Sequence, residues 1–228
     1  MGDSSSRVRS DPVTSPEPGP GPEPGPGGLA VADGLALAHY AARVVHHRLG
    51  GEVARFQLTD TAVLRASGAS FVTLERCGAL RGCVGTLDAR LPLYRDVARN
   101  AVRAMTDPRL SPVRPVEWPA LDVCVSVLTP LEPVPVPGDD PVAGWEYLCA
   151  RLRPGQDGLL ITADESRATF LPKVWEKLTE PARFLGALLA KGGWPDGRLP
   201  AGATVWRYTA TSYHQLAAGR EGWPDGPE

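Results

Sequence analysis

The chain has 228 residues, of which 43% are hydrophobic and 22% are charged, so it can form one large domain or one domain with a small appendage. Its formal net charge of −2 argues against a broad basic surface for nucleic acid, although a local basic patch would be hidden in that sum. No apolar run approaches the roughly 20 residues that cross a bilayer. We therefore expect a cytoplasmic protein that binds no membrane.

The chain contains four cysteines, at positions 77, 83, 124 and 149. No two of them have C-x-x-C spacing, and no histidine follows at the distance typical of a zinc finger. We therefore expect no metal site and no cofactor. An even number of cysteines is compatible with disulfides, but reduced thiols are the simpler interpretation for a long cytosolic chain.

The first 28 residues include seven prolines and six glycines, and little of this segment can be buried. Ordering it would therefore cost conformational entropy without a return. We predict a disordered tail at 1–28, a folded domain at 29–215 and a flexible tail at 216–228. A proline-rich tail could also bind a polyproline reader, but a solvated extension is the simpler interpretation.

A first helix is predicted to begin at Asp33, which can cap it, and to end at the glycine pair 50–51. Apolar residues recur between these limits at helical spacing. His46 and His47 fall in the last turn, where positive charge suits the helix dipole. Adjacent helical residues point about 100° apart, so the two histidines are predicted to be surface residues and not joint metal ligands.

The central part of the sequence predicts a hairpin, a helix and a strand. Residues 71–74 are rich in aromatic and β-branched side chains, and 80–87 return after a turn at 77–78. Residues 92–105 carry an apolar stripe at four-residue steps, which predicts a helix. Residues 121–127 alternate apolar and polar side chains, as a half-buried strand does.

The last third predicts a helix at 145–152, strands at 158–162 and 168–171, a helix capped by Thr179, and a strand at 204–208. Sequential hairpins without a regular βαβ rhythm favour a mostly antiparallel sheet with flanking helices. The chain has no G-x-G-x-x-G or P-loop sequence. We therefore predict an α+β fold.

The segment Leu80-Arg81-Gly82-Cys83-Val84-Gly85 is the most function-like feature of the sequence. Side chains alternate across a strand, so Leu80 and Val84 are predicted to face the core. Arg81 and Cys83 would then share the opposite face, with Cα atoms roughly 7 Å apart.

This strand could carry chemistry for two reasons. An arginine beside a thiol favours the reactive thiolate and could equally bind a carboxylate or phosphate. Gly82 and Gly85 suggest close approach by a ligand or another backbone, although a bulge or a packed helix would explain them as well. Cys83 could also be an ordinary buried residue, and no base is tied to it by the sequence, though His214 could approach from the C-terminal segment.

Six segments in order resemble the AMMECR domain family, known in prokaryotes as AmmeMemoRadiSam system protein A. They are residues 71–74, 80–86, 107–109, 125–130, 158–161 and 169–175. The resemblance implies a larger sheet-and-helix part, a smaller part, and a cleft between them. It also implies association with a Memo-type protein and a radical S-adenosylmethionine enzyme. No biochemical activity is established for the family, and the cleft beside Arg81 and Cys83 is where we expect an anionic ligand.

Other residues of these segments are candidate ligand contacts. Asp107 and Arg109 could bind the ligand, or could shape a turn and pair with neighbours. Ser126 could reach the ligand from the polar face of its strand, or could be a surface serine. Arg167 and Thr169 lie at a predicted hairpin, where an arginine could bind an anion or simply be solvated.

Three hypotheses follow for the function. The first is a binding or accessory module whose cleft, with Arg81 and Cys83, holds an anionic ligand while partner proteins do the redox chemistry. The second is a thiol-dependent enzyme with Cys83 as nucleophile or redox centre and Arg81 as its activator. The third is a nucleotide- or nucleic-acid-binding module, which the mildly acidic charge disfavours.

Overall fold

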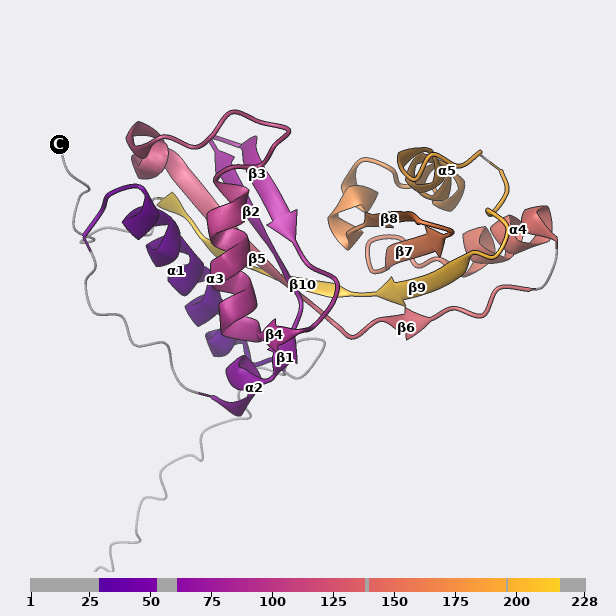
Figure 1. Cartoon of the computed structure of the whole chain (residues 1–228), viewed down its shortest axis with the longest axis horizontal. Helices are drawn as coiled ribbons and strands as arrows, with labels where there is room; N and C mark the ends of the chain where they lie inside the picture. Colours follow the sequence, from indigo (N-terminus) through magenta and orange to yellow (C-terminus); the bar gives the residue numbers. More distant parts are fainter. Residues whose placement is uncertain (1–28, 53–60, 138–139, 196, 218–228) are drawn as a thin grey trace, which may run out of the picture.

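The computed structural model describes residues 29–52, 61–137, 140–195 and 197–217. These residues form two lobes that lie side by side (Figure 1), each built on a four-stranded antiparallel sheet with helices packed against it. The predicted α+β class, mostly antiparallel with flanking helices, is confirmed. The tail predicted at 1–28 and all but the first two residues of the tail predicted at 216–228 lie outside the described residues.

The first lobe is a sheet with two helices on one face. Its strand order is β10-β5-β2-β3, and α1 (Val31–Arg48) and α3 (Leu93–Ala104) pack against the sheet and each other. Alternate strand residues such as Val72, Leu74 and Val125 are fully buried beneath these helices. The strands are β2 (Ser70–Arg76), β3 (Ala79–Gly85), β5 (Leu121–Leu128) and β10 (Ala210–Gln215).

Helix α1 differs from its prediction at its start, while the predicted stop at the glycine pair 50–51 is confirmed. It begins at Val31, so Asp33 lies in the first turn and is not the cap. It ends at Arg48, before Gly50 takes a positive φ of 93°. The prediction that His46 is a surface residue is wrong, because its ring is buried and stacked on Trp118 with centroids 4.6 Å apart.

The second lobe has the sheet order β6-β9-β7-β8. Helices α4 (Pro141–Arg151) and α5 (Pro181–Lys191) supply much of its core, with Trp175 stacked on Phe184 at 4.0 Å. Helix α4 begins four residues before its prediction, and the N-cap of α5 is Glu180, one residue after the expected Thr179. The strands are β6 (Glu132–Pro133), β7 (Gly158–Ala163), β8 (Ser166–Phe170) and β9 (Thr204–Tyr208).

Several short elements lack a sequence pattern long enough to predict. In chain order they are α2 (Ala62–Arg65), β1 (Ser67–Gly68), β4 (Leu91–Pro92), and the 3-10 helices η1 (Pro115–Ala120) and η2 (Pro172–Glu176). The sequence analysis did not predict strand β10. Within this strand only Tyr213 is buried and most side chains are polar, so no alternation of apolar residues marks it.

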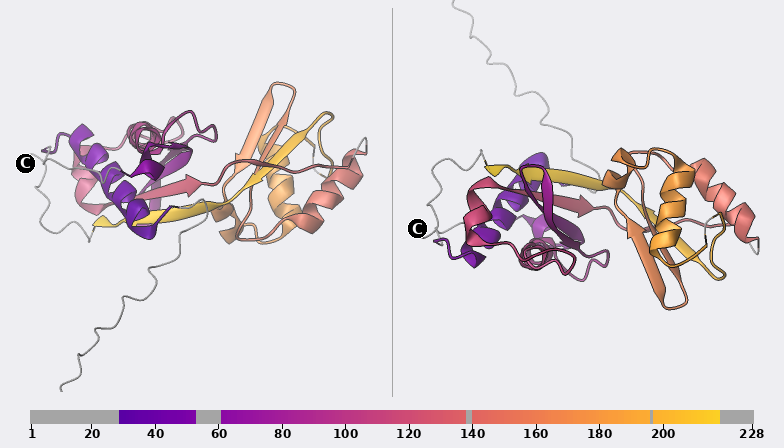
Figure 2. Two further views of the ribbon diagram at one scale, coloured as in Figure 1. Left: turned by 90° about the horizontal axis from the view of Figure 1, so that it is seen from below. Right: turned by 90° about the horizontal axis from the view of Figure 1, so that it is seen from above.

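Two adjacent chain crossings join the lobes (Figure 2): β5 leads into β6, and β9 leads back into β10. At the crossing, the Thr129 N–H donates to the Thr209 carbonyl at 3.0 Å, and the Thr209 N–H donates to Thr129 Oγ1 at 2.9 Å. An apolar cluster including Leu128 of β5, Leu160 of β7 and Tyr208 of β9 lies between the two sheets. The lobes therefore share a buried contact beyond their covalent connections.

Two ion pairs add to this contact. Lys173 of η2 lies 3.1 Å from Glu75 of β2, and Arg167 of β8 lies 3.4 Å from Asp88. Glu75 belongs to the sheet face that α1 and α3 leave uncovered, so part of the second lobe lies over that face. Both pairs are substantially exposed, and we expect each to contribute at most about 1 kcal/mol.

Gly82 is required by helix α3. A Cβ at this position would overlap the carbonyl oxygen of Ala104 in the last turn of that helix. We expect Gly82→Ala to lower the free energy of unfolding by about 3 kcal/mol, because the overlap is with backbone that has no room to move. Urea unfolding would measure this loss.

Gly155→Ala is the matched control. Gly155 has a positive φ of 78° and no atom near its missing Cβ, so it should cost only about 1 kcal/mol through backbone strain. Equal losses in the two variants would contradict the packing explanation for Gly82.

Candidate functional site

A register shift alters the geometry of β3. Gly82 pairs with Leu74 and Leu80 pairs with Glu75, which leaves Arg81 as an extra residue between them. Such a bulge reverses the alternation of faces. Leu80 therefore lies on the same side as Glu75 and is 45% exposed, so the prediction that it faces the core is wrong. Val84 does pack against the core of the first lobe.

Arg81 is engaged by the segment that follows α3. Its Nε donates to Glu117 Oε1 at 2.7 Å and its Nη2 to Oε2 at 3.2 Å. The same Nη2 donates to the carbonyls of Ser111 and Pro112. The hydrogen bond from Arg81, opposed by burial and helped by the Arg114 N–H, lowers the pKa of Glu117 to about 2. The Nε and Nη2 groups of Arg81 therefore donate to acceptors within the protein.

An open depression of about 610 Å³ is lined by Arg81, Ser111, Pro112 and Arg114. Cys83 is not part of it. Arg81 and Cys83 therefore have different neighbours, since Arg81 contacts the segment that follows α3 and Cys83 contacts Thr73.

The glycines of this strand do not open a groove. The backbone of Ala104 occupies the space beside Gly82, and the Phe71 ring would overlap a Cβ on Gly85. Of the two interpretations of these glycines, the structure supports close packing.

Asp107 and Arg109 clamp the outer edge of β3 at Cys83. The Cys83 N–H donates to Asp107 Oδ2 at 3.0 Å, and Arg109 Nη2 donates to the Cys83 carbonyl at 3.0 Å. Arg109 also forms a two-pronged ion pair with Asp107, at 2.6 and 2.9 Å. This hydrogen bonding, despite opposing burial, holds the pKa of Asp107 well below its usual range. The two residues satisfy a strand edge that has no neighbouring strand.

The Cys83 side chain points to the uncovered face of the sheet. Thr73 Oγ1 donates to its sulfur at 3.4 Å. Cys83, Thr73, Cys124 and His214 are in register on β3, β2, β5 and β10, so they form one row across this face. Neighbouring strands lie about 4.8 Å apart, which puts the two cysteines too far apart for a disulfide.

Cys124 and His214 form a second part of this row. The Cys124 sulfur lies 3.8 Å from His214 Nε2. Burial raises the pKa of the Cys124 thiol, an effect that hydrogen bonds from Ser126 and Ser212 and the charge of Lys173 partly oppose. Cys124 is therefore the less reactive of the two thiols in the row.

The second lobe brings Lys191, at the end of α5, to the edge where Cys83 and Arg109 lie. Its Nζ donates to the Thr169 carbonyl at 2.9 Å and lies 5.1 Å from the centre of the Phe170 ring. Burial, and then the charge of Arg109, lower the pKa of Lys191. We call Thr73, Cys83, Arg109 and Lys191 the interlobe site.

The remaining predicted residues are dispersed around this site. Ser126 Oγ and Ser212 Oγ are hydrogen-bonded at 2.8 Å on the uncovered face. Thr169 Oγ1 donates to the Leu159 carbonyl at 2.7 Å, while its own carbonyl accepts from Lys191. Arg167 pairs with Asp88 across the lobes.

Sequence reasoning missed Thr73 and Lys191 as site residues. Thr73 lies in a segment that had been assigned only a structural role. Lys191 is one of three lysines among 24 basic residues. Its rarity in a chain that otherwise uses arginine is a signal that could have marked it as a candidate.

Two broader predictions concern metals and membranes. Among the described residues, no group of three or more His, Cys, Asp or Glu side chains could hold a metal ion. Within the same ranges, no helix is both long enough and apolar enough to cross a bilayer.

The geometry defines a two-lobed α+β protein with a polar site between its sheets. The AMMECR1 family model matches residues 38–213, and the chain belongs to that family. A protein of Methanothermobacter thermautotrophicus is 35% identical over 190 residues, covering 80% of this chain and 94% of its own. A Thermococcus gammatolerans protein is 34% identical over 169 residues, covering 69% and 74%.

A solved structure has the same fold. The crystal structure of the uncharacterized protein PH0010 from Pyrococcus horikoshii is similar with a TM-score of 0.71 and 29% identity, covering 86% of this chain and 95% of that one. The fold described above is therefore shared with that protein.

The Arg81–Glu117 pair gives a pH-dependent stability. The pKa of Glu117 is about 2 in the folded protein and about 4.3 in an unfolded chain. Its stabilisation is therefore complete above about pH 4.3 and disappears as the pH falls toward 2. We expect the difference in unfolding free energy between wild type and Glu117→Gln to shrink by about 2 kcal/mol from pH 6 to pH 2. Urea midpoints at several pH values would measure it.

Arg81→Met removes the other partner of the ion pair. The unfolding free energy of this variant should therefore lack the loss between pH 6 and pH 2 that Glu117 causes in the wild type. Asp107 is present in all three proteins, so its own titration cancels in the comparison. Wild type and both variants losing stability in parallel with falling pH would contradict the assignment.

Proposed function

We propose that this protein is a ligand-binding component of a modification system and that it holds an anionic ligand at the interlobe site beside Cys83. The observation that supports the proposal is the position of two cations from different lobes: Arg109 donates to the Cys83 carbonyl at 3.0 Å, and Lys191 donates to the Thr169 carbonyl at 2.9 Å, near enough for the charge of Arg109 to lower its pKa. Opposite charge and N–H donors are what a carboxylate or phosphate requires. Arg81 and Arg109 are each paired with a carboxylate, but the Arg109 side chain is 64% exposed and that of Arg81 only 18%, so Arg109 is the more accessible of the two.

Partial burial strengthens this interpretation. Burial of part of the Lys191 side chain is the main cause of its lowered pKa, although the residue as a whole is exposed. A cation under that penalty gains more from an incoming anion than a fully solvated one does. Thr73 and the Cys83 thiol offer uncharged polar contacts in the same place.

A thiol-dependent enzyme is the second candidate, favoured by the hydrogen bond that Cys83 accepts from Thr73. A nucleophile of this kind needs a base. His214 is three strands from Cys83 in the row and lies against Cys124 instead. The binding role therefore has the stronger support. Either role needs a free thiol, so a reducing compartment such as the cytoplasm is part of the proposal.

Alkylation of Cys83 can report occupancy of the site. We expect phosphate or pyrophosphate, at constant ionic strength, to slow iodoacetamide modification of Cys83 in the wild-type protein. The Lys191→Gln variant should need roughly tenfold more anion for the same protection, because a charged hydrogen bond is lost. Peptide mass spectrometry distinguishes Cys83 from the exposed Cys77 and the buried Cys124.

Lys177→Gln is the matched control, since Lys177 is an exposed lysine of the same lobe and should leave protection unchanged. Cys77 serves as the internal reference for reagent reactivity. Absence of protection in wild type, or equal protection in the Lys191 and Lys177 variants, would reject the proposed site.

The family resemblance supports a partnership as part of the same proposal. We expect the full chain to co-purify with a Memo-type protein and with a radical S-adenosylmethionine enzyme when the three are expressed together. The same pull-down with the Lys191→Gln variant asks whether the partners need the interlobe site. Failure of the wild-type chain to retain either partner would remove this part of the proposal and leave ligand binding to be judged by protection alone.

A further inference from the structure

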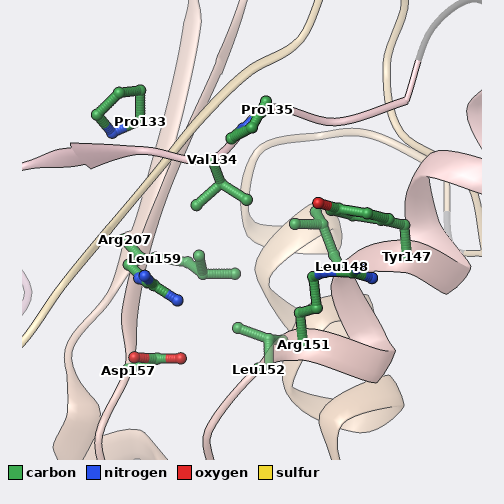
Figure 3. Close-up of a pocket in the computed structure, with 10 residues that line it drawn as sticks. All are labelled: Pro133, Val134, Pro135, Tyr147, Leu148, Arg151, Leu152, Asp157, Leu159 and Arg207. Atoms are coloured by element: carbon green, nitrogen blue, oxygen red, sulfur yellow. The ribbon is translucent and has the colours of Figure 1, made fainter.

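A separate pocket lies within the second lobe, between the β6 edge of its sheet and helix α4 (Figure 3). Its walls are largely apolar. Leu148 and Leu152 come from α4, Leu159 comes from β7, and Val134 follows β6. None of these residues belongs to the interlobe site.

Two arginines face this apolar space. Arg207 of β9 stands beside Asp157 on one side of the pocket, and Arg151 lies with Tyr147 on the other (Figure 3). The Arg151 guanidinium is stacked 3.8 Å above the Tyr147 ring. Such stacking fixes its position while leaving its in-plane N–H groups able to donate.

The acidic residue of the pocket is already neutralised. Asp157 is fully buried and accepts from the Arg153 N–H at 2.8 Å and from its guanidinium at 2.6 and 3.0 Å. The charge presented to a ligand is therefore positive, from Arg151 and Arg207.

Arg207 has an internal partner that a ligand could replace. Its Nε lies 3.2 Å from Glu132 Oε2, and the two side chains are 37% and 63% exposed. An exposed pair of this kind is weak. A carboxylate entering the pocket could take the place of Glu132 without a large penalty.

The size of the pocket limits the ligand. Its volume of about 240 Å³ is below the roughly 300–1,000 Å³ of sites for drug-sized ligands, so it favours a small ligand. We propose that this pocket binds a small monocarboxylate whose carboxylate pairs with Arg207 and whose apolar body lies against the leucines, with Arg151 adding positive charge on the opposite wall. Benzoate matches this description in charge, size and shape.

Benzoate titrations followed by NMR of the full chain test the inference. Benzoate should bind. Benzamide has the same size but no charge, and acetate has the charge but only a methyl group, so each should bind at least about fivefold more weakly than benzoate. Arg207→Gln should weaken benzoate roughly tenfold. Glu132→Gln should tighten it several-fold, because it frees Arg207 from its competitor.

Two controls separate this pocket from other effects. Arg183→Gln removes an exposed arginine of α5 that is paired with Glu180 in a similar way, and it should leave benzoate binding unchanged. Lys191→Gln should also have no effect, so failure here and failure of the interlobe site are distinguishable. The inference is overturned if benzoate does not bind at millimolar concentration, if benzamide binds equally well, or if Arg207→Gln binds like wild type.

Discussion

The buried carboxylate of Asp107 is the contact on which the arrangement around the interlobe site depends. It accepts the Cys83 N–H and holds Arg109, whose guanidinium in turn donates to the Cys83 carbonyl. An edge strand without these partners would expose its amide and carbonyl groups to other chains. Because the clamp acts on the backbone of Cys83, it also fixes the direction of that side chain toward the uncovered face of the sheet.

The interlobe site is incomplete in either lobe alone. The first lobe supplies the sheet row that contains Cys83 and Thr73, while the second supplies Lys191 from the end of a helix. The apolar cluster around Leu128, Leu160 and Tyr208 holds the two lobes together. A change in the packing of this cluster would therefore alter the spacing between Arg109 and Lys191.

Local patterns predicted most of the helices and strands, because periodicity reports which face of an element is buried. They failed where contacts between distant segments decide the outcome. The bulge at Arg81 depends on the pairing of two strands, and Gly82 is required by the end of α3. Lys191 lies in the neighbourhood of Arg109 and Cys83 only because one lobe packs on the other. Sequence reasoning thus singled out β3, but neither the pairing of Arg81 with Glu117 nor the packing of the second lobe beside this strand could be read from local patterns.

The double crossing at Thr129 and Thr209 has a consequence for how the chain is organised. The whole second lobe is one continuous insertion between two neighbouring strands whose ends are already hydrogen-bonded to each other. Excising residues 130–208 and bridging the gap with a tight turn would convert β5 and β10 into an ordinary hairpin. The loop-closure entropy of such a short connection is small, so the helix-covered sheet has the topology of an autonomous folding unit.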